Sequence, residues 1–169
     1  ENGTYGIRNY LLIIPASVCA SETAVNIAKL VNGAIAIPHQ HGCCEIGDDF
    51  ETTKRTLVGF GKNPNVGAVL VVGLGCEGIQ AKEIADEIAE SGKPVDYIVI
   101  QDECGTCKTV AKGVEIAGKM SRELAKQNKT EFDISEIILG LECGGSDPTS
   151  GLASNPTIGV ASDMLVNDG

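Results

Sequence analysis

Seven cysteines and two histidines are the residues of this chain with the most distinctive chemistry. They all lie in short polar segments that follow apolar runs, and His39, His41, Cys43 and Cys44 share one such segment. Thiolates bind iron–sulfur clusters, zinc and other soft metals, and imidazole binds mononuclear iron as well. A single cysteine is more often a small core residue than a ligand, but seven placed at random would not all fall in such segments. The pattern therefore predicts a site of metal or thiol chemistry.

Two shorter motifs offer competing interpretations. Residues 73–78 (GLGCEG) have the glycine spacing of a dinucleotide-binding turn, follow an apolar run and precede a helical pattern. The negative charge of Glu77 would repel a pyrophosphate, which argues against a nucleotide. Residues 104–107 (CGTC) have the spacing and the strand-to-helix placement of a thioredoxin-type redox pair. That interpretation leaves the other five cysteines unexplained.

Apolar runs and helical patterns alternate along the chain and must position these residues. Strands are predicted at residues 11–15, 34–38, 66–72, 95–100 and 137–141, and helices at 21–31, 48–60, 80–90, 106–127 and 155–166. Continuous apolar runs are typical of parallel strands that are covered on both faces. Strands that alternate with helices form parallel sheets with right-handed crossovers. The sequence therefore predicts a three-layer α/β/α sandwich with a five-stranded parallel sheet, of the Rossmann-like or flavodoxin-like class.

The polar segments after the five strands should lie together, because the carboxyl ends of parallel strands meet at one edge of the sheet. Each of these segments carries at least one cysteine. His39 and His41 flank Gln40 on a segment expected to be extended, so their side chains should point in opposite directions. At most one histidine is then expected to meet the same centre as Cys43.

The length and net charge of the chain limit its possible domain organisation and its possible partners. A chain of 169 residues fits a single α/β domain over residues 1–169, and its polar start and abrupt end suggest a fragment of a longer protein. The net charge of −10, without a basic stripe, argues against nucleic acid and anionic membranes as partners. No apolar run approaches the roughly 20 residues of a membrane span, and no signal peptide opens the chain. Seven cysteines in an α/β pattern indicate reduced thiols and a cytoplasmic protein.

Six ordered motifs resemble the altronate/galactarate dehydratase family, which also includes the large subunit of sulfolactate sulfo-lyase. The motifs are residues 5–11 (YGIRNYL), 38–43 (PHQHGC), 47–49 (GDD), 64–67 (PNVG), 73–77 (GLGCE) and 143–147 (CGGSD). The resemblance covers essentially the whole chain. It implies that the chain is the first part of a large catalytic region that continues beyond Gly169.

The resemblance implies a hydro-lyase of carbohydrate metabolism that converts a sugar-derived polyhydroxy acid into a 2-keto-3-deoxy acid. The implied cofactor is iron, as a ferrous ion or an iron–sulfur cluster, with manganese as the alternative. Expected partners are the sugar acid and the remainder of the polypeptide or a second subunit, and a homo-oligomer is left open. The alternative functions are a sulfolactate sulfo-lyase subunit and a non-catalytic module that binds a metal or a nucleotide.

The resemblance also assigns roles to matching residues. The implied metal ligands are Cys19, Cys43, Cys76 and Cys143, the implied catalytic residues are His39, His41 and Glu77, and the implied substrate-binding residues are Arg8, Asn9, Gln40, Gln101, Ser146 and Asp147. Loss of water from a 2,3-dihydroxy acid needs a base for the proton beside the carboxylate, and a metal can act as Lewis acid. A histidine or Glu77 is the candidate base, and Arg8 is the candidate partner of the substrate carboxylate. The thiols of Cys44, Cys104 and Cys107 depart from the family's pattern.

Overall fold

The computed structural model describes residues 5–142, 144–145 and 147–169, so the predicted site residues Cys143 and Ser146 lie outside the described residues. The chain divides into two compact units, the first ending at Asn128 and the second beginning at Lys129. The sequence predicts one domain over residues 1–169. The structure shows two compact units, and every buried core residue that it describes belongs to the first, while the single domain stays a prediction.

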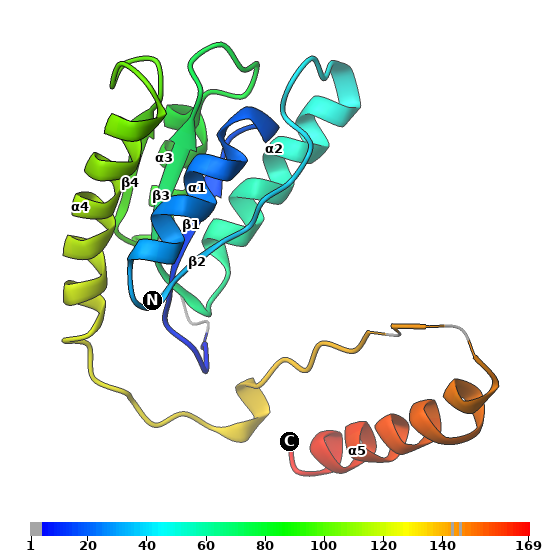
Figure 1. Ribbon diagram of the computed structural model, residues 1–169. Coiled ribbons are helices and arrows are strands. Elements are labelled where there is room, and N and C mark those ends of the chain that lie inside the picture. The colour runs from blue at the N-terminus through cyan, green and yellow to red at the C-terminus, as the bar shows by residue number, and fades with distance from the viewer. Residues whose placement is uncertain (1–4, 143, 146) are drawn as a thin grey trace. The chain divides into compact units, whose positions relative to one another are not determined.

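The first unit contains a parallel sheet of four strands (Figure 1). The strands are β1 (Tyr10–Pro15), β2 (Ala34–Ala36), β3 (Val66–Gly73) and β4 (Val95–Val99), in the order β2-β1-β3-β4. All three strand pairs are parallel. Four of the five predicted strands and their parallel pairing are therefore confirmed. The order reverses between β1 and β3, which is the position where open α/β sheets bind ligands, outside the carboxyl ends of the strands.

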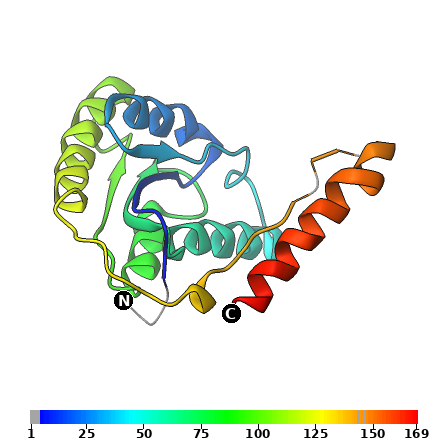
Figure 2. The same cartoon turned by 90° about the horizontal axis from the view of Figure 1, so that it is seen from below.

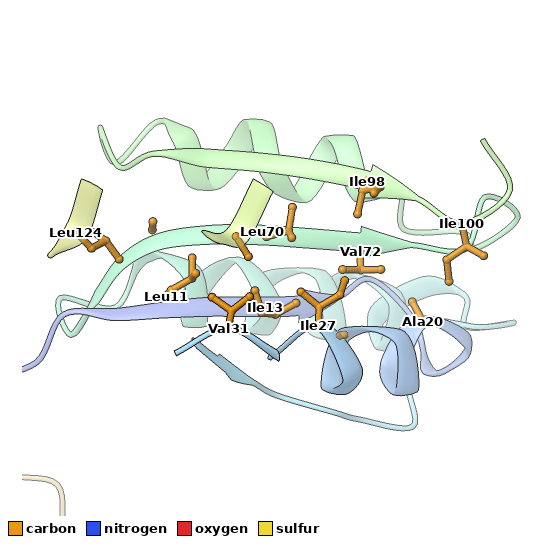
Figure 3. Packing of buried hydrophobic residues seen from close by; sticks show 13 residues of the cluster. Leu11, Ile13, Ala20, Ile27, Val31, Leu70, Val72, Ile98, Ile100 and Leu124 are labelled. Atoms are coloured by element: carbon orange, nitrogen blue, oxygen red, sulfur yellow. The ribbon is translucent and has the colours of Figure 1, made fainter. Parts of the chain in front are cut away.

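Two pairs of helices cover the two faces of this sheet (Figure 2). The helices are α1 (Val18–Leu30) and α4 (Thr106–Leu124) on one face, and α2 (Gly47–Lys62) and α3 (Ala81–Ala89) on the other. Side chains alternate along a strand, so Leu11 and Ile13 pack with α1 and α4 (Figure 3), whereas Leu12 and Ile14 pack in the core beneath α2 and α3. This α/β/α arrangement explains the unbroken apolar runs of the central strands β1 and β3.

The second unit contains short helical turns at Ile134–Glu136 and Ser150–Ser154 and the helix α5 (Asn155–Asn167). The fifth strand predicted over residues 137–141 is not formed, and this segment has no regular structure. Ile138 is 92% exposed. An apolar run becomes a strand only when its backbone pairs with a neighbouring strand, and the described sheet ends at β4. None of the helices in the described part of the chain has the length and hydrophobicity needed to cross a membrane.

Candidate active site

Every described cysteine lies in the loops after the four strands or in the first turns of the helices that follow. They are Cys19 at the start of α1, Cys43 and Cys44 before α2, Cys76 before α3, and Cys104 and Cys107 around the start of α4. All six are exposed and carry free thiols. The structure thus places Cys19, Cys43 and Cys76 at the carboxyl edge of the sheet, as the sequence predicts.

Cys43 is the centre of a small thiol cluster. Its Sγ lies 3.8 Å from the Sγ of Cys44, and the thiol of Cys19 also interacts with it. Hydrogen bonding to Cys44 and the charge of that neighbour, with a smaller contribution from Cys19, raise the pKa of Cys43 above its ordinary value. Within the described part of the chain, no interaction joins Cys76 to this cluster.

The thiol cluster does not form a complete metal site. Zinc and similar metals in proteins have at least three protein ligands. Among residues 5–142, 144–145 and 147–169, no group of three or more His, Cys, Asp or Glu side chains is arranged to hold a metal ion. The predicted ligands Cys19 and Cys43 converge, Cys76 stands apart, and Cys143 is not described. Among the described residues, two of the four predicted thiol ligands come together, and the binding of iron stays a prediction.

Both ring nitrogens of His39 form hydrogen bonds with the backbone. Its Nε2 lies 2.8 Å from the carbonyl oxygen of Pro15, and its Nδ1 lies 3.2 Å from the amide nitrogen of His41. A carbonyl only accepts and an amide N–H only donates, so Nε2 carries the hydrogen and Nδ1 is the acceptor. The Ser21 hydroxyl binds the backbone of His39 as well. His39 therefore joins the end of β1 to the β2–α2 loop and has no free ring nitrogen in this arrangement.

Gly42 brings the β2–α2 loop onto the start of α1. Its φ is +87°, and a Cβ at this position would lie 2.5 Å from the backbone oxygen of Ala16 and 2.9 Å from the Cα of Ser17. The amide of Val18 donates to the carbonyl of His41 at 2.8 Å in the same region. Only glycine combines this backbone conformation with so close an approach. The contact holds the residues on either side of Gly42 against α1, which carries Cys19.

His41 forms a hydrogen bond with Glu45 and keeps one ring nitrogen free of protein partners among the described residues. Its Nδ1 lies 3.1 Å from Oε1 of Glu45, and its side chain is 59% exposed. The carboxylate accepts, so Nδ1 donates, and no hydrogen bond within the described residues reaches Nε2. The rings of His39 and His41 are stacked, with centroids 6.3 Å apart. The expectation that these two side chains point in opposite directions is wrong, because β2 ends at Ala36 and the loop bends.

Glu45 is a functional candidate that the sequence did not reveal. Its side chain is only 16% exposed, and its Oε2 is buried without a hydrogen bond of regular geometry. Burial raises the pKa of Glu45, but interactions with the Thr53 hydroxyl, the Gly42 amide and His41 together lower it below its ordinary value. The carboxyl group is therefore ionised at neutral pH. A spacing of four residues indicates a contact only within a helix, and His41 to Glu45 is a loop.

A pocket of about 510 Å³ lies between this loop and α2. It is lined by His39, His41, Glu45, Asp49, Thr52, Thr53, Thr56, Ile37, Leu57 and Phe60. Its volume falls within the range of roughly 300–1,000 Å³ that is usual for small-molecule sites. The lining combines two imidazoles, two carboxylates and three threonines with the apolar side chains of Ile37, Leu57 and Phe60, which suits a small polar ligand.

Glu77 stabilises the loop after β3. Its carboxylate accepts hydrogen bonds from the amides of Leu74 at 3.1 Å and Gly75 at 2.6 Å, and the residue is only 5% exposed. A Cβ at Gly73 would lie 2.4 Å from Oε1 of Glu77, so the glycine makes room for the carboxylate. A dinucleotide-binding turn would offer these amides to a phosphate. Because Glu77 already occupies them, the structure argues against nucleotide binding at residues 73–78.

Arg8 and Asn9 precede β1 and lie at the opposite edge of the sheet. The Arg8 amide donates to Oδ1 of Asn65 at 3.0 Å, and Nδ2 of Asn9 donates to Oε1 of Gln127 at 2.9 Å. β1 has six residues, which corresponds to about 20 Å at roughly 3.3 Å per residue. The structure does not bring Arg8 or Asn9 together with His41. Their part in substrate binding stays a prediction.

The other predicted substrate residues are dispersed. Gln40 lines a hollow beside the histidines. Gln101 packs against the β3–α3 loop, because a Cβ at Gly75 would lie 2.6 Å from its Oε1. Asp147, in the second unit, accepts hydrogen bonds from the amide of Thr149 at 2.7 Å and from that residue's hydroxyl, which lower the pKa of Asp147. Binding of a substrate by these residues also stays a prediction.

Two family models match the sequence. The one described as "D-galactarate dehydratase/Altronate hydrolase, second domain" matches residues 1–125. The one described as "D-galactarate/Altronate dehydratase, C-terminal" matches residues 134–169. The gap between the two matches contains the boundary between the two structural units, after Asn128.

Three characterised relatives are similar to the chain over nearly its whole length. The (2R)-sulfolactate sulfo-lyase subunit beta of Chromohalobacter salexigens is 35% identical over 169 residues, which cover 100% of this chain and 43% of the relative. The altronate dehydratase of Bacillus subtilis is 34% identical over 181 residues (100% and 36%), and that of Escherichia coli is 31% identical over 179 residues (99% and 36%). The chain thus spans 36–43% of the length of these relatives. No solved structure matches it.

Proposed function

Because this chain belongs to the D-galactarate/altronate dehydratase family, we propose that it forms part of a lyase that removes water from a sugar-derived polyhydroxy acid. The product is a 2-keto-3-deoxy acid. The chain spans 36–43% of its relatives' length, so the proposed enzyme includes further protein, from the same polypeptide or from a second subunit. The exposed apolar side chains of the second unit, such as Leu152 and Val166, support a partner of this kind.

The observation that carries this proposal is the ring of His41 at the pocket beside α2. Its Nδ1 is bound to Glu45, its Nε2 is free of protein partners within the described residues, and three threonines line the same pocket. An imidazole nitrogen with a free lone pair is the group most often used as a general base. Hydroxyl groups in the wall suit a ligand that is itself rich in hydroxyls.

The proposed reaction is an elimination. Nε2 of His41 takes the proton from the carbon beside the substrate carboxylate. The electron pair of that C–H bond forms a double bond to the next carbon, whose hydroxyl group leaves with a proton as water. The resulting enol tautomerises to the 2-keto acid, so the net change is the loss of one water molecule.

Iron, or manganese in its place, remains part of the proposal. Cys19 and Cys43 would be two of its ligands, and the others would come from Cys76, Cys143 or the rest of the protein. A bound divalent ion would supply a Lewis acid for the negative charge that develops on the substrate. Thiolates select soft metals, so this donor set suits ferrous iron better than manganese.

A second candidate function is the elimination of sulfite from sulfolactate. The 35% identity to a sulfo-lyase subunit over the whole chain supports it. The same base and pocket would serve, because only the leaving group differs. A non-catalytic module that binds a nucleotide is less well supported, since Glu77 occupies the two loop amides that a phosphate would need.

Three further features belong to the proposal. We propose a flavodoxin-like class for the first unit, which the strand order β2-β1-β3-β4 supports. We propose a cytoplasmic location, which the six free thiols support. A homo-oligomer is compatible with the exposed apolar residues of the second unit.

The test uses the full-length protein, purified without oxygen and supplied with ferrous iron or manganese. Galactarate, altronate and sulfolactate are offered separately, and the 2-keto-3-deoxy acid or sulfite is measured. His41→Asn is expected to lower turnover by about 10²–10⁴-fold. Glu115→Gln, in an exposed ion pair on α4, serves as the control and should leave turnover unchanged. Absence of turnover with all three acids, or an unaffected His41→Asn variant, would overturn the proposal.

A further inference from the structure

We propose that Glu45 is a positioning residue, whose carboxylate fixes the tautomer and the orientation of the His41 ring. This inference rests on the proposed function, because it concerns the same base. Glu45 contacts the imidazole and also lines the pocket, but it acts through His41.

The first observation is the geometry of the contact. Nδ1 of His41 lies 3.1 Å from Oε1 of Glu45. An ionised carboxylate can only accept, so the contact forms only when Nδ1 carries the hydrogen. The lone pair of the neutral ring is then on Nε2, which has no protein hydrogen bond among the described residues. Carboxylates orient catalytic and metal-binding histidines in this way in many unrelated enzymes.

The second observation is the other oxygen of the same carboxylate. Oε2 of Glu45 is one of only two buried side-chain oxygen or nitrogen atoms without a hydrogen-bond partner among the described residues. A buried acceptor without a regular partner lowers stability, and an apolar side chain at this position would avoid that loss. The carboxylate also interacts with the Thr53 hydroxyl and the Gly42 amide, so it is held between the loop and α2 while its Oε1 contacts His41.

The third observation is that the backbone around this pair is held in place. The carbonyl of His41 accepts the amide of Val18 at 2.8 Å, and Gly42 packs against the backbone of Ser17. Glu45 lies two residues before the first residue of α2, and Thr53 on that helix interacts with its carboxyl group. His41 itself is 59% exposed and its ring stacks on that of His39, and the hydrogen bond to Glu45 is the one polar contact among the described residues that restricts its rotation. Glu45 is the group that limits this rotation.

The test combines kinetics with a direct measurement of the tautomer in the full-length protein. Glu45→Gln keeps the shape of the side chain but can donate as well as accept. It is expected to lower kcat on the order of 100-fold and to change KM by less than about 3-fold. Glu45→Asp keeps the carboxylate but shortens the side chain by one methylene group, which moves the carboxylate away from His41. Its kcat should fall only about 10-fold.

The tautomer is read from nitrogen-15 spectra of histidine-labelled protein, with the His41 signals assigned by their loss in His41→Asn. Spectra are recorded at about pH 8.5, where an ordinary histidine, with a pKa of about 6.5, is neutral. Wild-type His41 should be mainly in the Nδ1–H form, and Glu45→Gln should shift it toward the Nε2–H form. The control Glu115→Gln should change neither measurement.

Each outcome of these measurements either supports or overturns one of the two proposals. An unchanged tautomer ratio in Glu45→Gln, or an unchanged kcat in an active enzyme, overturns the role of Glu45. A protein that turns over none of the acids refutes the proposed function, while the tautomer spectra still test the contact. A melting temperature of Glu45→Gln within about 2 °C of wild type, together with the loss of kcat, excludes a purely structural effect and supports the proposal.

Discussion

Gly42→Ala should unfold the first unit more easily and separate the β2–α2 loop from α1. Two costs add at this position. Alanine with a positive φ costs about 1–2 kcal/mol relative to its ordinary conformation. Its Cβ would also lie 2.5 Å from Ala16 O and 2.9 Å from Ser17 Cα, both of which are backbone atoms that cannot rotate away. Relieving such an overlap typically costs about 1–3 kcal/mol.

A matched control isolates the second cost. Gly33 also has a positive φ, +78°, but a Cβ there would meet no atom within 4 Å. Gly33→Ala should therefore show only the conformational cost, reduced by about 0.4–1 kcal/mol because alanine has less freedom in the unfolded chain. The expected loss of unfolding free energy is about 0.5–1 kcal/mol for Gly33→Ala and about 2–4 kcal/mol for Gly42→Ala.

Two assays of the full-length protein check this comparison. Urea denaturation gives the difference in unfolding free energy between the two variants. Mild oxidation with diamide, followed by mass spectrometry, reports how readily Cys19 and Cys43 form a disulfide, and this cross-link should form more slowly in Gly42→Ala alone. Equal stability of the two variants, with equal cross-linking, would show that the close approach of Gly42 to α1 does not hold the loop.

Three further changes have defined outcomes. Glu77→Gln weakens the acceptor of two loop amides and should cost about 1–3 kcal/mol of unfolding free energy by denaturation. Lys54→Met removes ion pairs between α2 and α3 and should cost about 0.5 kcal/mol. These ion pairs raise the pKa of Lys54, so their contribution is present below about pH 10.5 and lost as pH rises through the higher folded-state pKa. Lys119→Met, which removes an exposed ion pair with Glu115 within α4, is the control. Cys44→Ser should lower the pKa of Cys43, which the pH dependence of its alkylation rate by iodoacetamide measures.

The parallel sheet could be predicted because its signal is local. β1 and β3 are unbroken apolar runs, and in both strands every residue from the third to the fifth is buried. Such runs, each followed by a helical pattern, leave few alternatives to a covered parallel sheet. Once the strands are parallel, the segments after them must share one edge. The positions of Cys19, Cys43 and Cys76 follow from that topology alone.

Residues 137–141 show where local signals fail. This run (IILGL) is more apolar than β4 (VDYIV), yet only β4 is a strand. β4 pairs with β3 in a register that begins with Val95 opposite Val69. Pairing depends on which backbone edge is available in the folded chain, and the sequence of the run itself does not contain that information.

The contact between His41 and Glu45 was hidden from the sequence for a related reason. An extended segment would place His39 and His41 on opposite sides, but the loop turns through positive φ angles of +87° at Gly42 and +59° at Cys44. These turns bring Glu45 back to His41. A non-glycine residue at positive φ cannot be recognised from residue type, so neither the bend nor the partner of His41 was predictable.

The three predicted bases differ in the hydrogen bonds that each would have to break in order to accept a proton. For Glu77 to accept a substrate proton, its carboxylate must release two loop amides, and hydrogen bonds to charged groups are each worth about 1.5–3 kcal/mol. For His39 to act, its ring must leave the Pro15 carbonyl or the His41 amide, which together hold the β2–α2 loop in place. Nε2 of His41 gives up no protein hydrogen bond among the described residues, and its ring already borders the pocket. A penalty of about 3 kcal/mol would slow the reaction by roughly 100-fold. This comparison supports the proposal that His41 is the base.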